Sequence, residues 1–158
     1  DPALCEDDEG PLACEYRRVR PAVAVMMFGP NDMINLRIEE FEVAVRGIID
    51  LSLAEGVIPV LTTFTWHRDV RWEQALQFNM VVVDLAREYD IPLINFWRAA
   101  QELPNLGLVR DYTHLTAGSV GTRIAFTGDE AVSGYTLRNL LTLQTLDLLR
   151  REVLNGQP

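Results

Sequence analysis

The segment "PAVAVMMFGPND", residues 21–32, joins a run of apolar residues to an abrupt polar end. Residues 23–28 are continuously apolar, which is the pattern of a strand that is covered on both faces of a sheet. The run stops at Gly29, a residue type that commonly ends strands. Asn31 and Asp32 then place an amide and a carboxylate where a buried strand reaches the surface. The segment therefore predicts a sheet strand with polar groups at its carboxyl end.

Helical and strand-like segments alternate after this first strand. Apolar residues recur at steps of three and four from Ile34 to Ile48, and Gly56 stands where such an amphipathic helix would end. The remaining segments are a strand over 57–64, a helix over 72–89, a short strand over 91–96, a brief helix over 97–103, a turn-rich segment over 104–134 and a leucine-rich helix over 135–154. Leucines on several faces of the last helix predict substantial burial. Apolar strands that alternate with helices predict parallel βαβ units, and so an α/β fold with three layers, an α/β/α sandwich.

Composition excludes several classes of function. The 158 residues suit one domain, and 48% of them are apolar, enough to bury a core. The formal charge of −9 argues against a nucleic-acid partner, which would be bound by clustered Lys and Arg. No apolar run approaches the ~20 residues that span a bilayer, so no transmembrane segment is predicted.

Residues 1–20 are predicted to be an acidic loop that precedes the α/β domain of residues 21–158. Cys5 and Cys14 are the only cysteines and lie close together in this polar segment. A local disulfide between them is predicted, and with it an extracytoplasmic or secreted location. Two unpaired thiols are the alternative, and a metal site is disfavoured because nothing nearby supplies two more soft ligands.

Polar residues follow the predicted strand ends, which is where open parallel sheets bind ligands. Trp66, His67 and Arg68 follow the second strand and form a possible substrate loop. His114 lies three residues after Asp111 in the turn-rich segment. Such a carboxylate can accept the Nδ1–H of the imidazole, which leaves Nε2 to take a proton from a hydroxyl nucleophile. A structural histidine with a local hydrogen bond is the alternative, and a metal is disfavoured because a third ligand could come only from His67.

Asn31 also allows two interpretations. It can cap the helix that starts a few residues later, together with Asp32. Its amide can instead donate to an oxyanion that develops in a reaction at the strand end. In that case Gly29 would let a substrate approach the backbone closely.

Taken together, these residues resemble the SGNH (GDSL-type) hydrolase superfamily. One family block is an apolar strand that ends in Gly-x-Asn-Asp, here Gly29-Pro30-Asn31-Asp32. Another is Asp-x-x-His before a small apolar residue, here Asp111-Tyr112-Thr113-His114-Leu115. The helix, short strand and polar residue in "FNMVVVDLAREYDIPLINFWRAAQEL" also resemble the family's approach to the second block. The resemblance covers roughly residues 22–150.

The resemblance implies a flavodoxin-like sandwich that hydrolyses carboxylic esters without a metal or an organic cofactor. It implies that His114 is the general base and Asp111 its orienting acid. It also implies that Asn31, with Gly29, forms the oxyanion hole, while Asp32 supports the Asn31 loop.

The chain departs from the family at the block Gly-Asp-Ser, which carries the nucleophile on the first family strand. No such block precedes Gly29, and the serines that remain are Ser52, Ser119 and Ser133. Ser119 shares the loop of His114 but follows no strand. The segment 124–136 echoes the missing block with Glu130 in the serine position, but it falls where the family enters its last helix. A truncated chain is the simplest explanation: the sheet would be incomplete at its N-terminal side, because the N-terminal segment or a second chain carries the missing part.

Two functions follow as expectations. The first is a serine ester hydrolase, an acyl esterase or lipase-like enzyme, whose nucleophile is not in this chain; the 158-residue chain alone would be inactive. Its substrate would be a small-molecule ester or an acylated carbohydrate. The second is a non-catalytic module that binds a carbohydrate or an acyl-bearing partner, with Trp66, Trp72 and Trp97 as stacking surfaces. Core packing is the alternative role of these tryptophans.

Overall fold

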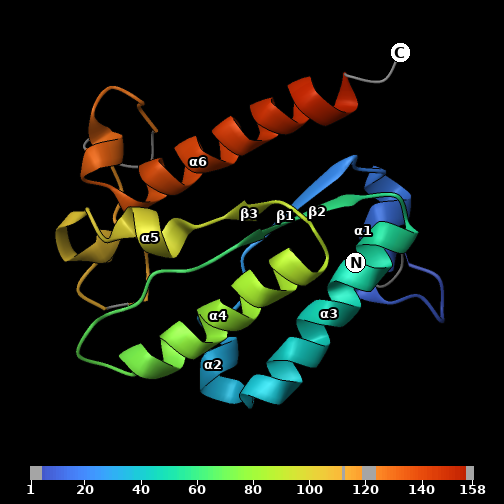
Figure 1. The fold of residues 1–158 in the computed structure, drawn as a ribbon, viewed down its shortest axis with the longest axis horizontal. Coiled ribbons are helices and arrows are strands. Elements are labelled where there is room, and N and C mark those ends of the chain that lie inside the picture. The colour runs from blue at the N-terminus through green and yellow to red at the C-terminus, as the bar shows by residue number, and fades with distance from the viewer. Residues whose placement is uncertain (1–4, 112, 119–123, 156–158) are drawn as a thin grey trace.

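The computed structural model describes residues 5–111, 113–118 and 124–155. Its centre is a parallel sheet of β1 (Val23–Met26), β2 (Ile58–Thr62) and β3 (Leu93–Ile94), with β2 in the middle (Figure 1). Val25 pairs with Val60 in one ladder, and Leu61 pairs with Leu93 in the other. A helix lies in each crossover between the strands, as parallel pairing requires.

Helices cover both faces of this sheet. α3 (Ile38–Ala54) and α4 (Trp72–Glu88) lie on one face, while α5 (Phe96–Ala100) and α6 (Gly134–Leu149) lie on the other (Figure 1). The core of the first layer is aromatic: the rings of Phe41 and Phe78 lie 4.8 Å apart above the sheet. The predicted fold class, an α/β/α sandwich with a parallel sheet, is confirmed.

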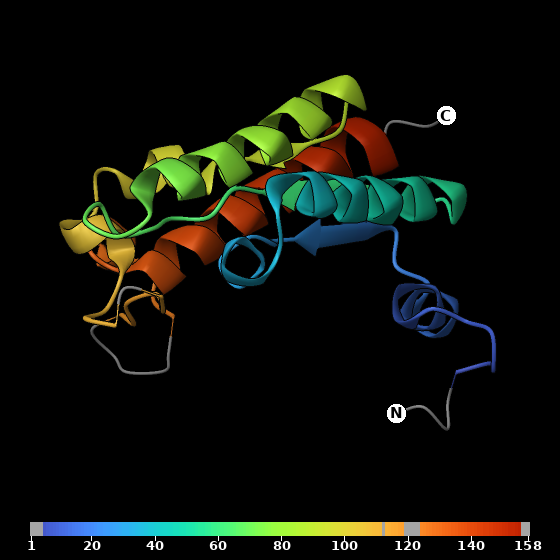
Figure 2. The ribbon, with the colours of Figure 1, turned by 90° about the horizontal axis from the view of Figure 1, so that it is seen from below.

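The N-terminal segment contains a helix that the sequence did not predict. α1 (Pro11–Val19) begins with Pro11 in its first turn, a position that favours proline. Figure 2 shows α1 beyond the amino end of β1. The buried Tyr16 anchors it there, because its hydroxyl lies 2.8 Å from Ser52 Oγ. Cys5 and Cys14 form a disulfide between the preceding loop and this helix. The expectation of a loop over residues 1–20 is therefore wrong for Pro11–Val19.

The helix predicted from Ile34 onward is interrupted. α2 (Asp32–Asn35) ends after one turn, and α3 starts only at Ile38. The Glu40 carboxylate accepts the Arg37 N–H at 2.9 Å, an interaction that fixes a new helix start. The apolar period continues through the break, which is why the sequence pattern alone did not reveal it.

The sequence predicted that the apolar side chains of β1 and α6 are buried, and this is wrong for several of them. Val25 of β1 and Phe28 just after it are each 39% exposed, although the apolar run predicted cover on both faces. On α6, Leu143 and Leu148 are each 52% exposed. Within the described residues β1 pairs only with β2, so its other edge is open. Open edges and bare apolar side chains are surfaces that folded proteins normally cover.

In the described parts of the segment between α5 and α6, the chain forms short elements rather than strands. η2 (Pro104–Gly107) and η3 (Asp129–Ala131) are single turns, and Leu108 and Leu115 form an isolated antiparallel bridge. After α6, the chain continues as η4 (Arg150–Leu154). Among the described residues, no helix combines the length and the apolar character needed to cross a membrane.

Candidate active site

The turn after β1 is built around the carboxylate of Asp32. Asp32 Oδ2 accepts the backbone N–H of Gly29 at 2.8 Å, which closes the turn on itself. Gly29 has φ +127°, and a Cβ atom at this position would overlap the ring of Phe64 at the end of β2. Glycine is therefore required here by packing against Phe64. Because its N–H is bound to Asp32, Gly29 shapes the turn and does not present an oxyanion donor.

Asn31 occupies the N-cap position of α2 but does not cap it. Its side chain makes no capping hydrogen bond, and the residue is exposed. Its carbonyl oxygen instead accepts the side-chain amide of Asn35 at 2.7 Å. Within the described part of the chain no hydrogen bond engages the Asn31 amide. The geometry disfavours the capping interpretation and leaves an amide available at the carboxyl end of β1.

Asp111 and His114 form a hydrogen-bonded pair. Asp111 Oδ2 lies 2.6 Å from His114 Nδ1, and Oδ1 accepts the backbone N–H groups of Thr113 and His114 at 3.0 Å each. Both carboxylate oxygens are therefore occupied by groups of the same loop. A carboxylate on Nδ1 favours the tautomer that carries its proton there, so Nε2 is directed away as an acceptor. The orientation matches that of a general base.

The same contacts keep Asp111 ionised. The backbone N–H of His114, then that of Thr113, and then the imidazole of His114 stabilise the carboxylate, and they lower the pKa of Asp111 to about 2. Protonation of the carboxyl group would weaken these interactions. The acceptor for the imidazole N–H is therefore maintained at any pH above that value.

The lowered pKa can be measured directly. In a carbon-13 NMR titration, the side-chain carboxyl of Asp111 is expected to change protonation near pH 2, below the ordinary aspartate value of about 3.9. In His114→Ala the pKa should rise but stay below the ordinary value, because the two backbone donors remain. The direction follows from the contacts, since each one favours the ionised form. A midpoint at the ordinary value in the unmodified protein would contradict this geometry.

Backbone hydrogen bonds anchor the Asp111–His114 loop. The N–H of Val109 donates to the His114 carbonyl at 2.9 Å, and the N–H of Thr116 donates to the Gly107 carbonyl at 2.8 Å. The imidazole itself is 71% exposed. Figures 1 and 2 place this loop and α2 toward the same end of the sheet, where the strands end. No direct hydrogen bond joins Asn31 to Asp111 or His114 in the described residues.

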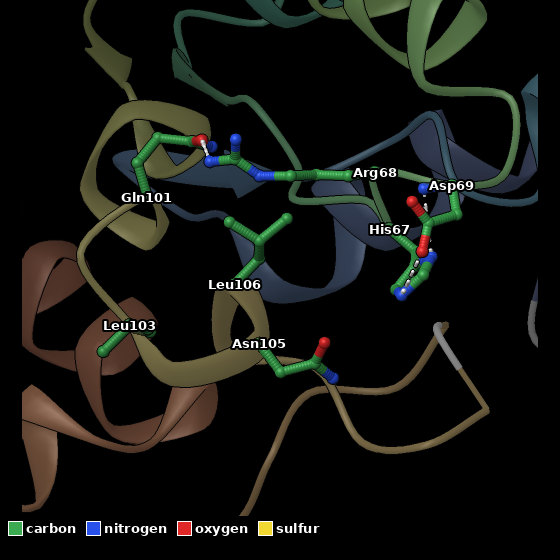
Figure 3. A pocket seen from close by; sticks show the side chains of 7 residues that line it. All are labelled: His67, Arg68, Asp69, Gln101, Leu103, Asn105 and Leu106. Carbon is green, nitrogen blue, oxygen red and sulfur yellow. Dashed lines mark hydrogen bonds and ion pairs between the residues drawn. The ribbon is translucent and has the colours of Figure 1, made fainter.

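The three residues of the predicted substrate loop lie in two different environments. Trp66 is 5% exposed, packs against Phe64 and donates its indole N–H to the Val70 carbonyl at 2.7 Å. It belongs to the core, so its expected contact with substrate is wrong. His67 and Arg68, in contrast, line a surface pocket with Asp69 (Figure 3).

The opposite wall of this pocket comes from residues that the sequence did not single out, namely Gln101, Leu103, Asn105 and Leu106. Asn105 and Leu106 both have left-handed backbones, with φ of 48° and 57°. Neither residue is a glycine, so the turn left no strong signal in the sequence. Asn105 was the one weak indication of a left-handed turn, because asparagine tolerates this conformation better than most residues.

Neither serine that the structure describes is suited to act as a nucleophile. Ser52 is fully buried in α3, where its hydroxyl bonds Tyr16 and the Ile48 carbonyl. Ser133 is fully buried as the N-cap of α6, and its hydroxyl donates to the Thr116 carbonyl at 2.8 Å. Ser119, the third serine of the sequence, lies outside the described residues. Glu130 of η3 accepts the N–H of the N-cap residue Gly128, so the segment that echoes Gly-Asp-Ser is a turn before α6.

Comparisons with solved structures identify proteins of the same fold. A lipase/acylhydrolase from Enterococcus faecalis superposes with a TM-score of 0.66 at 19% identity, over 84% of this chain and 64% of that one. A GDSL-like lipase from Bacteroides thetaiotaomicron superposes with a TM-score of 0.63 at 17% identity, over 84% of this chain and 67% of that one. The chain thus spans about two thirds of the length of these structures. No family model and no curated protein matches the sequence.

Proposed function

We propose that the chain is the larger part of a GDSL-type serine ester hydrolase, and that it supplies the general base, its orienting acid and an oxyanion donor. The observation that carries the proposal is the contact of 2.6 Å between Asp111 Oδ2 and His114 Nδ1. The pair lies in a fold shared with a lipase/acylhydrolase and a GDSL-like lipase. The family resemblance of the Gly29–Asp32 and Asp111–Leu115 blocks supports the same assignment.

The proposed reaction is acyl transfer in two halves. A serine hydroxyl from outside the described residues attacks the ester carbonyl while His114 Nε2 takes its proton. The negative charge that develops on the carbonyl oxygen accepts a hydrogen bond from the Asn31 amide. The C–O bond to the alcohol then breaks, and the alcohol leaves with the proton from His114. Water repeats the sequence on the acyl-enzyme, which releases the acid and restores the serine.

The proposed oxyanion donor can be tested separately from the base, through Asn31. In the complete protein, Asn31→Ala should lower kcat for p-nitrophenyl acetate by about 10²–10³-fold with little change in KM, because the amide binds charge that exists only in the transition state. Asn35→Ala is a matched control, since its amide binds the Asn31 carbonyl and not the reaction centre. Equal effects of the two variants would contradict the role of Asn31.

We further propose that another strand completes the sheet at the open edge of β1. The exposed side chains of Val25 and Phe28 beside that edge, and the part of the related structures that has no counterpart here, support this proposal. The occupant would be the polypeptide that carries the nucleophile, because a parallel neighbour of β1 would end beside Asn31. An open strand edge with apolar neighbours otherwise favours association between copies.

The isolated 158-residue chain is accordingly expected to associate. Its apparent mass in sedimentation should rise with protein concentration, and its unfolding midpoint should depend on concentration. A chain that includes the missing strand should unfold at a midpoint independent of concentration. Cooperative unfolding of the isolated chain as a monomer at all concentrations would contradict the proposed open edge.

The disulfide between Cys5 and Cys14 supports an extracytoplasmic location, because such bonds persist in oxidising compartments.

A binding module without catalysis is the second candidate function, and the absence of a suitable serine among the described residues favours it. Hydrolysis of p-nitrophenyl acetate by the complete protein distinguishes the two functions. Activity supports the enzyme, and ligand binding without any turnover supports the module.

A further inference from the structure

The pocket between the β2–α4 loop and η2 has a volume of about 340 Å³. That volume lies at the lower end of the range of about 300–1,000 Å³ found for ligand sites. His67, Arg68 and Asp69 form one side, and Gln101 with Asn105 forms the other (Figure 3). The pocket therefore has room for one small ring.

Its polar wall combines a cation and an anion. The Arg68 guanidinium crosses the pocket to donate to Gln101 Oε1 at 2.9 Å (Figure 3). Its Cζ atom also lies 5.4 Å from the centroid of the Trp72 ring. These contacts fix its orientation and use one of its five N–H groups, so donors remain for a ligand. The neighbouring carboxylate of Asp69 is 87% exposed and presents acceptors only. Donors and acceptors thus stand side by side at the mouth.

The opposite wall also contains two leucines and is held in place. Leu103 and Leu106 are buried, and the Leu106 side chain lies at the centre of the pocket in Figure 3. The buried Thr65 hydroxyl donates to the Leu106 carbonyl at 3.0 Å, and the Asn105 amide donates to the Leu108 carbonyl at 2.8 Å. These bonds hold the left-handed turn, so the wall exists before a ligand arrives. A preformed wall reduces the ordering cost of binding.

This combination distinguishes between classes of ligand. An acyl chain would offer no hydrogen-bond partner to the remaining N–H groups of Arg68 or to the Asp69 carboxylate. A carboxylate or phosphate would bind Arg68, but it would be repelled by Asp69. A sugar ring carries hydroxyls that both donate and accept, and its C–H face can pack on Leu106. We propose that this pocket binds a neutral sugar ring, with Arg68 and Asp69 as its polar contacts.

The site refines the proposed function and rests on it for the position of the ester. The chain runs from the pocket wall at Asn105 and Leu106 through Leu108 to Leu115, which forms a bridge with Leu108 next to His114. The pocket wall is thus joined to the segment that carries the general base, because the Gly107 carbonyl after Leu106 accepts the Thr116 N–H at 2.8 Å. The substrate class would then be acylated carbohydrates, with the sugar as the alcohol that leaves.

Binding can be tested without catalysis. The complete protein would be titrated with the methyl β-pyranosides of glucose, galactose and xylose, and intrinsic tryptophan fluorescence would be followed, because Trp72 lies under Arg68. At least one glycoside should bind saturably, and Arg68→Met and Asp69→Ala should each raise its Kd by at least about tenfold. Arg87→Met is the matched control, because this arginine is 77% exposed on α4 and lies outside the pocket. The Kd of the glycoside should not change in this variant.

Monomethyl succinate and cyclohexanol serve as the anionic and apolar comparators. The proposal is overturned if either binds more tightly than every glycoside with the same dependence on Arg68, or if no glycoside binds. It is also overturned if Arg68→Met and Asp69→Ala bind as well as the unmodified protein. The same titration in His114→Ala separates the two proposals, since glycoside binding should persist there whether or not His114 is the base.

Discussion

Replacing His114 by alanine in the complete protein is expected to lower kcat for p-nitrophenyl acetate by about 10⁴–10⁶-fold. A serine hydroxyl is a poor nucleophile at neutral pH unless a base takes its proton during the attack. Nε2 of His114 is the group oriented for this task, since Asp111 binds the other ring nitrogen. The p-nitrophenolate leaves without protonation, so this substrate reports on the base during attack.

The fold should survive the substitution, because the imidazole is 71% exposed and the loop is anchored through the His114 carbonyl. Unchanged circular dichroism and thermal unfolding would verify this. Added imidazole should restore part of the activity if the side chain acts as a base, and should restore none if it only supports the loop. Activity within tenfold of the unmodified protein would rule out His114 as the general base.

The sequence predicted the fold where one physical cause dominates. Strands β1 and β2 are largely apolar runs, and α4 follows a 3.6-residue period, so hydrophobic patterning was enough to predict these elements. Prediction failed where individual polar contacts, local or distant, decide the structure. Glu40 caps a new helix at Arg37 within an unbroken apolar period, and Tyr16 holds α1 through a distant partner, Ser52.

The candidate site was predictable to the extent that its chemistry is local. Asp111 and His114 lie three residues apart, so a loop can bring them together without help from the rest of the fold. The wall of the pocket depends on a hydrogen bond from Thr65 to Leu106 between distant parts of the chain. Trp66 was assigned to the substrate loop because its burial depends on a core cluster that distant residues such as Phe41 and Phe78 complete.

Asp111→Asn is expected to lower kcat by about 10⁴-fold while the loop keeps its shape. The asparagine oxygen can still accept the N–H groups of Thr113 and His114, as Asp111 Oδ1 does at 3.0 Å. Its amide nitrogen would then face His114 Nδ1 as a donor. The imidazole must accept that hydrogen bond on Nδ1 and so carry its proton on Nε2, which removes the base from the position that faces the nucleophile.

Nitrogen-15 NMR of the two histidines measures this tautomer change directly. His114 should switch its proton from Nδ1 to Nε2 in Asp111→Asn, whereas His67, whose Nδ1 accepts the Asp69 N–H at 3.2 Å, should keep its pattern in both proteins. Asp84→Asn is the matched control, because this exposed carboxylate on α4 pairs only with Arg87 among the described residues. Asp84→Asn should change neither the tautomer of His114 nor kcat. A large loss of kcat without a change of tautomer would mean that Asp111 acts through its charge, and an unchanged kcat would remove it from the catalytic machinery.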